Sequence, residues 1–205
     1  PIAVAVPSDE AFPFVFDAAT SIVQRGDIEL KARKGDPVPP GWVTCTEGAD
    51  THDAAGVLRG LVAGDTALLP LGGAGDESGG HKGYGMSATV ELLCCALQGG
   101  AFLSGLSAEE NGKPVPRRNG HFFIAMDIVA FDEPDQVKKR VGEVMRELRS
   151  ARKEHGRERI FTPGEREFVA SAEREKRGVL VTDSVLDELR TMRDELALSR
   201  RRFSF

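Results

Sequence analysis

A glycine-rich run meets a basic pair at the point where a long apolar helix is predicted to begin. Residues 68–100 read LLPLGGAGDESGGHKGYGMSATVELLCCALQGG, with His81 and Lys82 at the start of the helical part. Glycine lets a backbone approach a ligand closely, and a helix start supplies unpaired N–H groups and partial positive charge. Lysine in the first helical turn is electrostatically unfavourable, which favours a binding role for Lys82. The pattern predicts a site for a phosphate- or carboxylate-bearing ligand, with a flexible surface loop before a core helix as the alternative.

The common nucleotide-binding fingerprints do not fit this run. Ser78 stands where the third glycine of G-x-G-x-x-G is required, and His81 separates Gly80 from Lys82, which breaks the Walker pattern. No two histidines have metal-ligand spacing, and no Ser-His-Asp arrangement or nucleophile elbow is evident. The spacing of residues therefore predicts no metal site and names no catalytic residue.

A second candidate is Asp17, which ends an apolar run and precedes Ala18, Ala19 and Thr20. A carboxylate at the end of a strand, beside small residues, leaves room for a ligand. A turn or helix cap made by the Asp17 side chain is the alternative.

Composition narrows the class of protein. The 205 residues carry a net charge of -5, with 29% charged and 40% hydrophobic residues, which gives no reason to expect a nucleic-acid partner. No apolar run approaches the roughly 18 residues of a membrane span, and no signal peptide is recognisable. The three cysteines, Cys45, Cys94 and Cys95, lack C-x-x-C spacing and are predicted to be reduced. We expect a cytoplasmic protein.

The predicted elements alternate between strands and helices. Strands are predicted at 1–7, 13–21, 121–131 (as a central strand) and 179–181, and helices at 21–34, from 84 to 98, after Asp135, after Gly164 and after Ser184. Residues 35–66 are predicted to form a loop or small excursion. The helix from Tyr84 is apolar nearly all round and is predicted to be buried. This mixture predicts an α/β class with a mixed sheet and flanking helices.

The segment GGHKGYGMSATVELLCCALQGGAF strongly resembles the signature of the malate/L-lactate/L-sulfolactate dehydrogenase family. PIAVAVP, FDAATSIVQRGDIE, GHFFIAMDIVAF and FTPGERE match further family segments in the same order. The resemblance implies a non-Rossmann dehydrogenase fold, which would explain why the usual fingerprint fails. It also implies a cofactor-binding domain at 1–130 and a C-terminal segment at 131–205 that packs back on the catalytic domain.

The resemblance further implies NAD or NADP as cofactor, held by three segments of the chain. The implied cofactor-binding residues are Pro13, Phe14, Val15, Phe16, Asp17, Ala18 and Ala19, then His81 and Lys82, then Gly164, Glu165 and Arg166. The implied reaction is reversible hydride transfer between the nicotinamide and a 2-oxo or 2-hydroxy acid, such as malate, lactate, sulfolactate or a ureidoglycolate-like acid, or a related cyclic imine.

One departure from the family pattern concerns catalysis. Family members carry a further N-terminal part with the proposed acid/base histidine and a substrate-binding arginine, which this sequence does not match. Reduction of a 2-oxo acid needs a proton donor and a cation for the carboxylate. We therefore expect an N-terminal segment, as a separate or cleaved chain, to complete an oligomeric enzyme, and residues 1–205 alone to be inactive. The alternatives are a non-catalytic nucleotide-binding or scaffold subunit and an anion-binding regulatory module.

Overall fold

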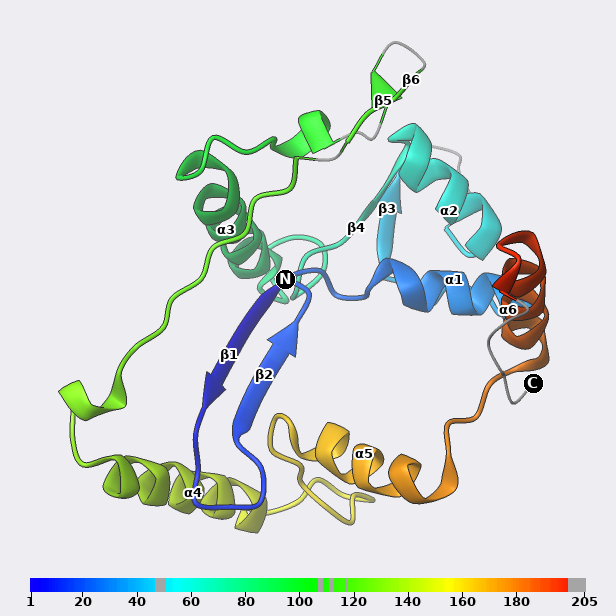
Figure 1. Ribbon diagram of the computed structural model, residues 1–205. Coiled ribbons are helices and arrows are strands. Elements are labelled where there is room, and N and C mark those ends of the chain that lie inside the picture. Colours follow the sequence, from blue (N-terminus) through cyan, green and yellow to red (C-terminus); the bar gives the residue numbers. More distant parts are fainter. Residues whose placement is uncertain (47–50, 107–108, 111–112, 117, 199–205) are drawn as a thin grey trace.

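The computed structural model describes residues 1–46, 51–106, 109–110, 113–116 and 118–198 (Figure 1). Its strands pair antiparallel, two by two: β1 (Ile2–Val6) with β2 (Phe14–Ala18), β3 (Val43–Cys45) with β4 (Thr66–Leu68), and β5 (Glu109–Glu110) with β6 (Lys113–Pro114). The helices are α1 (Arg25–Lys34), α2 (Ala54–Ala63), α3 (Gly80–Glu91) continued by a π-helical turn (Leu92–Ala96), α4 (Pro134–Ser150), α5 (Glu165–Arg177) and α6 (Asp183–Glu195). Short 3-10 turns lie at Leu103–Leu106 and Ile128–Ala130. The class is mixed helix and strand, as expected.

The hydrophobic core of the described chain lies among α1, α2, β3 and β4. Ile28 and Val38 are fully buried there, with Val57 of α2, and Trp42 packs against them. The predicted helix at 21–34 begins four residues late, at Arg25. Ile28 is the buried residue of this helix, whereas Leu30 is 54% exposed.

Residues 35–66 contain more structure than a loop. The side chain of Asp53 caps α2 by accepting hydrogen bonds from the N–H groups of Ala55 and Gly56, at 3.1 and 2.9 Å. The polar and glycine-rich residues on either side of α2 led to the prediction of a loop, although an Asp before an apolar run is a helix-start signal.

The β1–β2 hairpin confirms the two N-terminal strands and occupies the middle of the molecule, with α4 and α5 at its turn end and α3 near its open end (Figure 1). The register pairs Ile2 with Ala18 and Val6 with Phe14. Beyond β2, Ser21 bridges to Pro70, which ties the hairpin to the loop before α3.

The predicted central strand at 121–131 is absent. Residues 121–127 form no strand, and Phe123 and Ile124 are 87% and 71% exposed. The same holds for 179–181, where Leu180 is 94% exposed. A strand needs a neighbour to satisfy its backbone hydrogen bonds, and no described segment pairs with either one. The described sheets are consequently antiparallel pairs of strands, and the described residues do not form the predicted mixed sheet.

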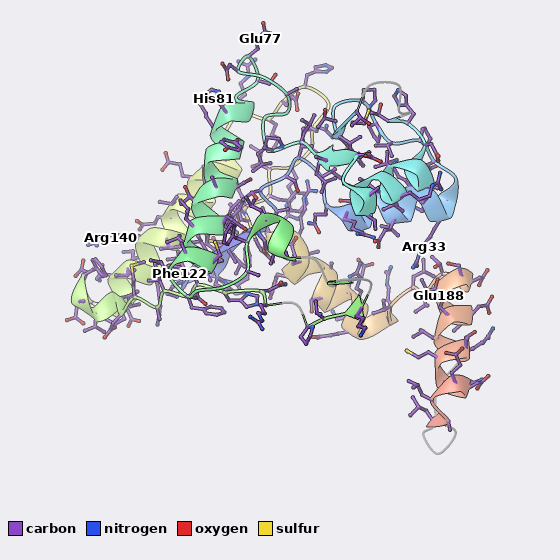
Figure 2. The ribbon with its side chains drawn as sticks, turned by 90° about the horizontal axis from the view of Figure 1, so that it is seen from above. Arg33, Glu77, His81, Phe122, Arg140 and Glu188 are labelled. Carbon is purple, nitrogen blue, oxygen red and sulfur yellow. The ribbon has the colours of Figure 1, made fainter. Side chains whose placement is uncertain are left out.

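One helix also differs in burial from expectation. On α3 and its π-helical continuation, Tyr84 and Leu92 are 69% and 61% exposed, so this helix is not buried. Helix α6 stands apart from the rest of the molecule, next to α1, where Arg33 pairs with Glu188 at 3.5 Å (Figure 2). Large apolar areas of these elements face solvent.

Candidate functional site

A cavity of about 680 Å³ lies between β2 and the turn that begins α5. We call it the β2–α5 cavity; the two elements lie next to each other in Figure 1. It is lined by Phe12, Pro13, Val15, Phe16, Asp17, Phe161, Thr162, Pro163, Gly164, Arg166, Glu167 and Phe168. Segments that are about 150 residues apart in the sequence therefore form one wall.

Gly164 allows the turn to lie directly on β2. Its φ of 89° is left-handed, which glycine adopts without strain. A Cβ at this position would lie 3.1 Å from both the Cβ and the backbone nitrogen of Val15. The N–H of Val15 donates to the carbonyl of Pro163 at 3.2 Å, so the turn is also hydrogen-bonded to the strand.

Glu165 lies behind this turn with a side chain that is only 4% exposed. Its carboxylate accepts hydrogen bonds from the Thr162 N–H at 3.0 Å, from the Thr162 hydroxyl at 3.2 Å and from the Arg159 guanidinium. Burial acts to raise the pKa of Glu165, but these hydrogen bonds outweigh it and hold the pKa below its usual value. The carboxylate is therefore charged at neutral pH and fixes the shape of the turn.

Aromatic rings and a few charges give the cavity its chemistry. Phe12 and Phe168 stack with ring centroids 5.2 Å apart, and the Arg166 guanidinium lies 4.6 Å from the centre of the Phe161 ring. The carboxylates of Asp17 and Glu167 are also part of the lining. Such a surface can take a planar ring against the aromatic side chains and hydroxyl or phosphate groups at the charged ones.

Half of the sequence-predicted cofactor residues lie in this wall. They are Pro13, Val15, Phe16, Asp17, Gly164 and Arg166. Phe14 lines a separate small cavity against α4, and Glu165 is buried behind the turn. Ala18 and Ala19 follow the lining segment along the chain and are not part of it.

His81 and Lys82 lie elsewhere. His81 sits at the outer end of α3 near Glu77, and its Nδ1 is 3.3 Å from Asp76 Oδ1 (Figure 2). Lys82 lines a different cavity, of about 440 Å³, between α3 and the glycine-rich loop. The structure does not bring this pair into the β2–α5 cavity.

Close packing accounts for glycines in the loop before α3. A Cβ on Gly80 would lie 2.1 Å from the carbonyl oxygen of Gly73. The N–H groups of Gly79 and Gly80 donate to the carbonyls of Asp76 and Gly75, at 3.0 and 3.1 Å. These two amides are therefore already hydrogen-bonded within the protein, and the anion site predicted at the helix start stays a prediction.

Three of the four aromatic residues of the wall were not found by sequence reasoning, Phe16 being the exception. Phe12, Phe161 and Phe168 each flank a predicted cofactor segment by one to three residues, which is the one signal that could have identified them. Across the residues with described positions, no group of His, Cys, Asp and Glu side chains could hold a metal ion. In the same residues, no helix is long and apolar enough to cross a membrane.

Comparison with known proteins identifies the family. Residues 1–190 match the model of the malate/L-lactate dehydrogenase family. The chain belongs to this family. It is 38% identical over 192 residues to a malate dehydrogenase of Pyrococcus abyssi, covering 92% of this chain and 50% of that protein. It is 34% identical over 192 residues to a delta(1)-pyrroline-2-carboxylate reductase of Ancylobacter novellus, covering 94% and 51%.

Solved structures of the malate/L-lactate dehydrogenase family share this fold. The crystal structure of malate dehydrogenase from Entamoeba histolytica superposes with a TM-score of 0.90 at 35% identity, over 99% of this chain and 55% of that one. The chain thus spans about half the length of the relatives it matches. The fold of these dehydrogenases is therefore shared over nearly the whole described chain.

Proposed function

We propose that this chain is the cofactor-binding part of an NAD(P)-dependent oxidoreductase that acts on 2-oxo and 2-hydroxy acids or on cyclic imines. The observation that carries the proposal is the β2–α5 cavity, which joins two of the three segments that the family resemblance assigns to the cofactor. The named relatives act on malate and on pyrroline-2-carboxylate. Both substrates have a carboxylate next to the carbon that is reduced or oxidised, and we propose a substrate of that class here.

The residues of the β2–α5 cavity fit a nicotinamide dinucleotide. The volume of the cavity falls in the range of roughly 300–1,000 Å³ that small-molecule sites occupy. Phe16 and Phe161 would lie against planar rings, Arg166 would meet a phosphate, and Asp17 would accept from ribose hydroxyls. When bound, the nicotinamide supplies the hydride or accepts it, while the chain holds and orients the ring. These groups suit both NAD and NADP.

A dinucleotide is elongated, and we propose that it extends from the β2–α5 cavity along β2 toward Lys82 and His81. The end of β2 is joined to α3 and to the preceding loop in two places. The Leu71 N–H donates to the Thr20 carbonyl at 3.0 Å, and the Ser87 hydroxyl lies 3.5 Å from the same oxygen. Lys82 would then supply a cation to a phosphate or carboxylate on that side.

The exposed surface supports a second polypeptide segment in the complete enzyme. A compact monomer of 22.1 kDa exposes about 9,300 Å² by the usual scaling with mass, whereas this chain exposes 15810 Å². The excess of about 6,500 Å² is of the order that large obligate interfaces bury, about 5,000 Å² and more. We propose that the half of the family sequence that the chain does not match covers much of this area.

Two apolar surfaces of this chain are candidates for the area that the unmatched half of the family sequence would cover. The first is the segment 121–127, which forms no strand and in which Phe123, Ile124 and Met126 are 71–87% exposed. The second is a hollow of about 810 Å³ along α3, lined by Tyr84 and Leu92 among others. Large exposed apolar patches mark interaction sites.

Turnover needs a proton donor beside the oxygen or nitrogen that is bonded to the reacting carbon. The lining of the β2–α5 cavity contains no histidine, and we propose that the N-terminal family segment supplies the acid/base histidine. Residues 1–205 then bind cofactor without catalysing hydride transfer, and the active form is an oligomer.

Fluorescence titration with NADH and NADPH tests the proposal directly. Saturable binding of either one, without oxidation by pyruvate, oxaloacetate or sulfopyruvate, supports a cofactor-binding part. The absence of binding favours a scaffold subunit, and binding of inorganic phosphate alone favours an anion-binding module. The native mass of the assembly, followed by the denatured masses of its components, then shows whether a second polypeptide is present.

A further inference from the structure

Arg149, near the end of α4, lies behind the β2–α5 cavity and contacts several parts of its wall. Its Nη1 donates to the hydroxyl of Thr162 at 3.2 Å and lies 3.7 Å from a carboxylate oxygen of Glu165. Its Nη2 donates to Glu10 in the hairpin turn, and its guanidinium lies 5.9 Å from the centre of the Phe12 ring. Arg149 is not itself in the cavity lining.

We propose that Arg149 is a positioning residue. With Glu10 it holds the two halves of the wall of the β2–α5 cavity, 12–17 and 161–168, in register for the cofactor. The proposal rests on the proposed function, because it concerns the same cavity. Thr162 and Phe12 both line that cavity, one on the turn before α5 and one on the segment before β2. One guanidinium therefore connects both halves of the wall from behind.

The burial and charge of this cluster support a specific geometry. The side chains of Arg149 and Glu10 are 20% and 14% exposed, and Glu165 is 4% exposed. One cation thus faces two largely buried carboxylates. A planar guanidinium with several N–H donors can bond Glu10 and Thr162 at once, whereas a lysine ammonium acts as a single point charge. A change at Arg149 leaves at least one buried carboxylate without part of its compensation.

Helix α4, which carries Arg149, is also held close to the hairpin. The N–H of Asp9 donates to the carbonyl of Lys138 at 3.2 Å, and a Cβ added to Gly142 would lie 1.7 Å from the Asp9 carboxylate. Arg146 adds ion pairs to Asp9 at 3.0 Å and to Glu10 at 3.3 Å. Helix α4 is therefore fixed against the turn of the hairpin, so that a displacement of the Arg149 side chain is transmitted to the wall rather than absorbed by the helix.

Variants of the full 205-residue chain test the positioning role. Arg149→Met removes the hydrogen bonds at similar side-chain length, Arg149→Lys keeps the charge, and Glu10→Gln removes one partner at constant shape. Arg177→Met is the matched control, because Arg177 is a 79% exposed arginine of α5 paired with Glu173 away from the cavity lining. NADH affinity is measured by fluorescence titration, and local order by amide hydrogen exchange over 13–17 and 160–168, with far-UV circular dichroism as the folding check.

We expect Arg149→Met to weaken NADH binding by roughly tenfold, because the two halves of the wall lose charge-assisted hydrogen bonds that hold them in register. Arg149→Lys should recover part of the affinity, and Arg177→Met should bind as the parent chain does. Exchange over 160–168 should accelerate in the Arg149 variants and in Glu10→Gln. If Arg149→Met does not fold, Glu10→Gln carries the same expectation.

Two results separate the two proposals. A parent chain that binds neither NADH nor NADPH overturns the proposed function, while the exchange data still decide whether Arg149 holds the wall together. A folded Arg149→Met chain, or a folded Glu10→Gln chain where Arg149→Met is unfolded, with parent-like NADH affinity and parent-like exchange over 160–168 overturns the positioning role.

Discussion

Gly164→Ala is the most direct test of how the β2–α5 cavity is built. Gly164 has φ 89° and ψ -17°, and an added Cβ would lie 3.1 Å from the backbone nitrogen of Val15 and 3.3 Å from the carbonyl of Pro13. The backbone of a paired strand cannot rotate out of the way as a side chain can. We expect the turn to shift away from β2 and to open the cavity.

The expected cost has two parts. A non-glycine residue in the left-handed region costs about 1 kcal/mol. Displacing the turn weakens the bond from the Val15 N–H to Pro163, now 3.2 Å long, and a hydrogen bond contributes about 1 kcal/mol. The free energy of unfolding should therefore fall by about 2 kcal/mol, and NADH affinity should fall by fivefold or more, since about 1 kcal/mol of the loss lies in the cavity wall.

Gly64→Ala provides the matched control. Gly64 has nearly the same conformation, with φ 85° and ψ 8°, but nothing lies within 4 Å of its added Cβ. It should lose about 1 kcal/mol of stability from backbone strain alone and bind NADH as the parent chain does. Urea unfolding and NADH titration measure both variants. Equal losses of stability in the two, with NADH affinity unchanged in Gly164→Ala, would refute the contact between the turn and β2 as the support of the cavity.

Three further predictions concern the core, acid stability and the basic pair. Ile28→Ala should cost about 2–5 kcal/mol of unfolding free energy because Ile28 is fully buried, whereas Leu30→Ala, at a 54% exposed site, should change urea unfolding little; similar losses would contradict the observed core. The lowered pKa of Glu165 stabilises the fold above the ordinary glutamate pKa of 4.5, and this contribution should disappear as the pH falls below 4.5 through the folded-state pKa. Urea midpoints measured from pH 6 to pH 3 should consequently drop more steeply in the parent chain than in Glu165→Gln, and parallel curves would exclude this role. Lys82→Met should weaken NADPH binding several-fold and reduce its salt dependence if the cofactor reaches α3, while Lys153→Met, at an exposed loop position, should leave both unchanged; identical isotherms would confine the cofactor to the β2–α5 cavity.

Local signals in the sequence predicted the elements whose structure is decided locally. The apolar run before Pro7 forms β1, and the turn residues around Gly164 start α5 where expected. The two N-terminal strands find each other through a short connection, so their pairing needs no distant partner. For such elements, strand propensity and turn chemistry were sufficient.

Elements that depend on distant partners were not predicted correctly. Residues 121–131 have the composition of a buried central strand but lack a described neighbouring strand, so 121–127 form no strand and 128–130 form a 3-10 turn. Helix α3 and its π-helical continuation are apolar on several sides, yet Tyr84 and Leu92 are exposed to solvent. In both segments the composition predicts burial, whereas the described residues leave the side chains exposed.

The candidate site shows the same division between local and distant information. Pro13 and Gly164 were identified through the family resemblance, but no periodicity in either segment indicates that they meet across about 150 residues. Glu165 belongs to the same short motif, and only the structure shows that its side chain turns inward to Thr162 and Arg159. A motif names neighbours in sequence; it does not separate the residue that faces the ligand from the one that supports it.

Under the proposed function, the cavity and the surface of this chain predict different requirements for cofactor binding and for turnover. Both halves of the cavity wall, 12–17 and 161–168, come from this chain, and the contacts that hold them together are internal to it. By contrast, many large apolar side chains are exposed, and the cavity lining has no histidine to transfer a proton. Binding of NADH or NADPH should therefore persist when the chain is isolated, and hydride transfer should require the remaining family segment. A chain that binds cofactor only after that segment is added would place part of the cavity wall outside residues 1–205.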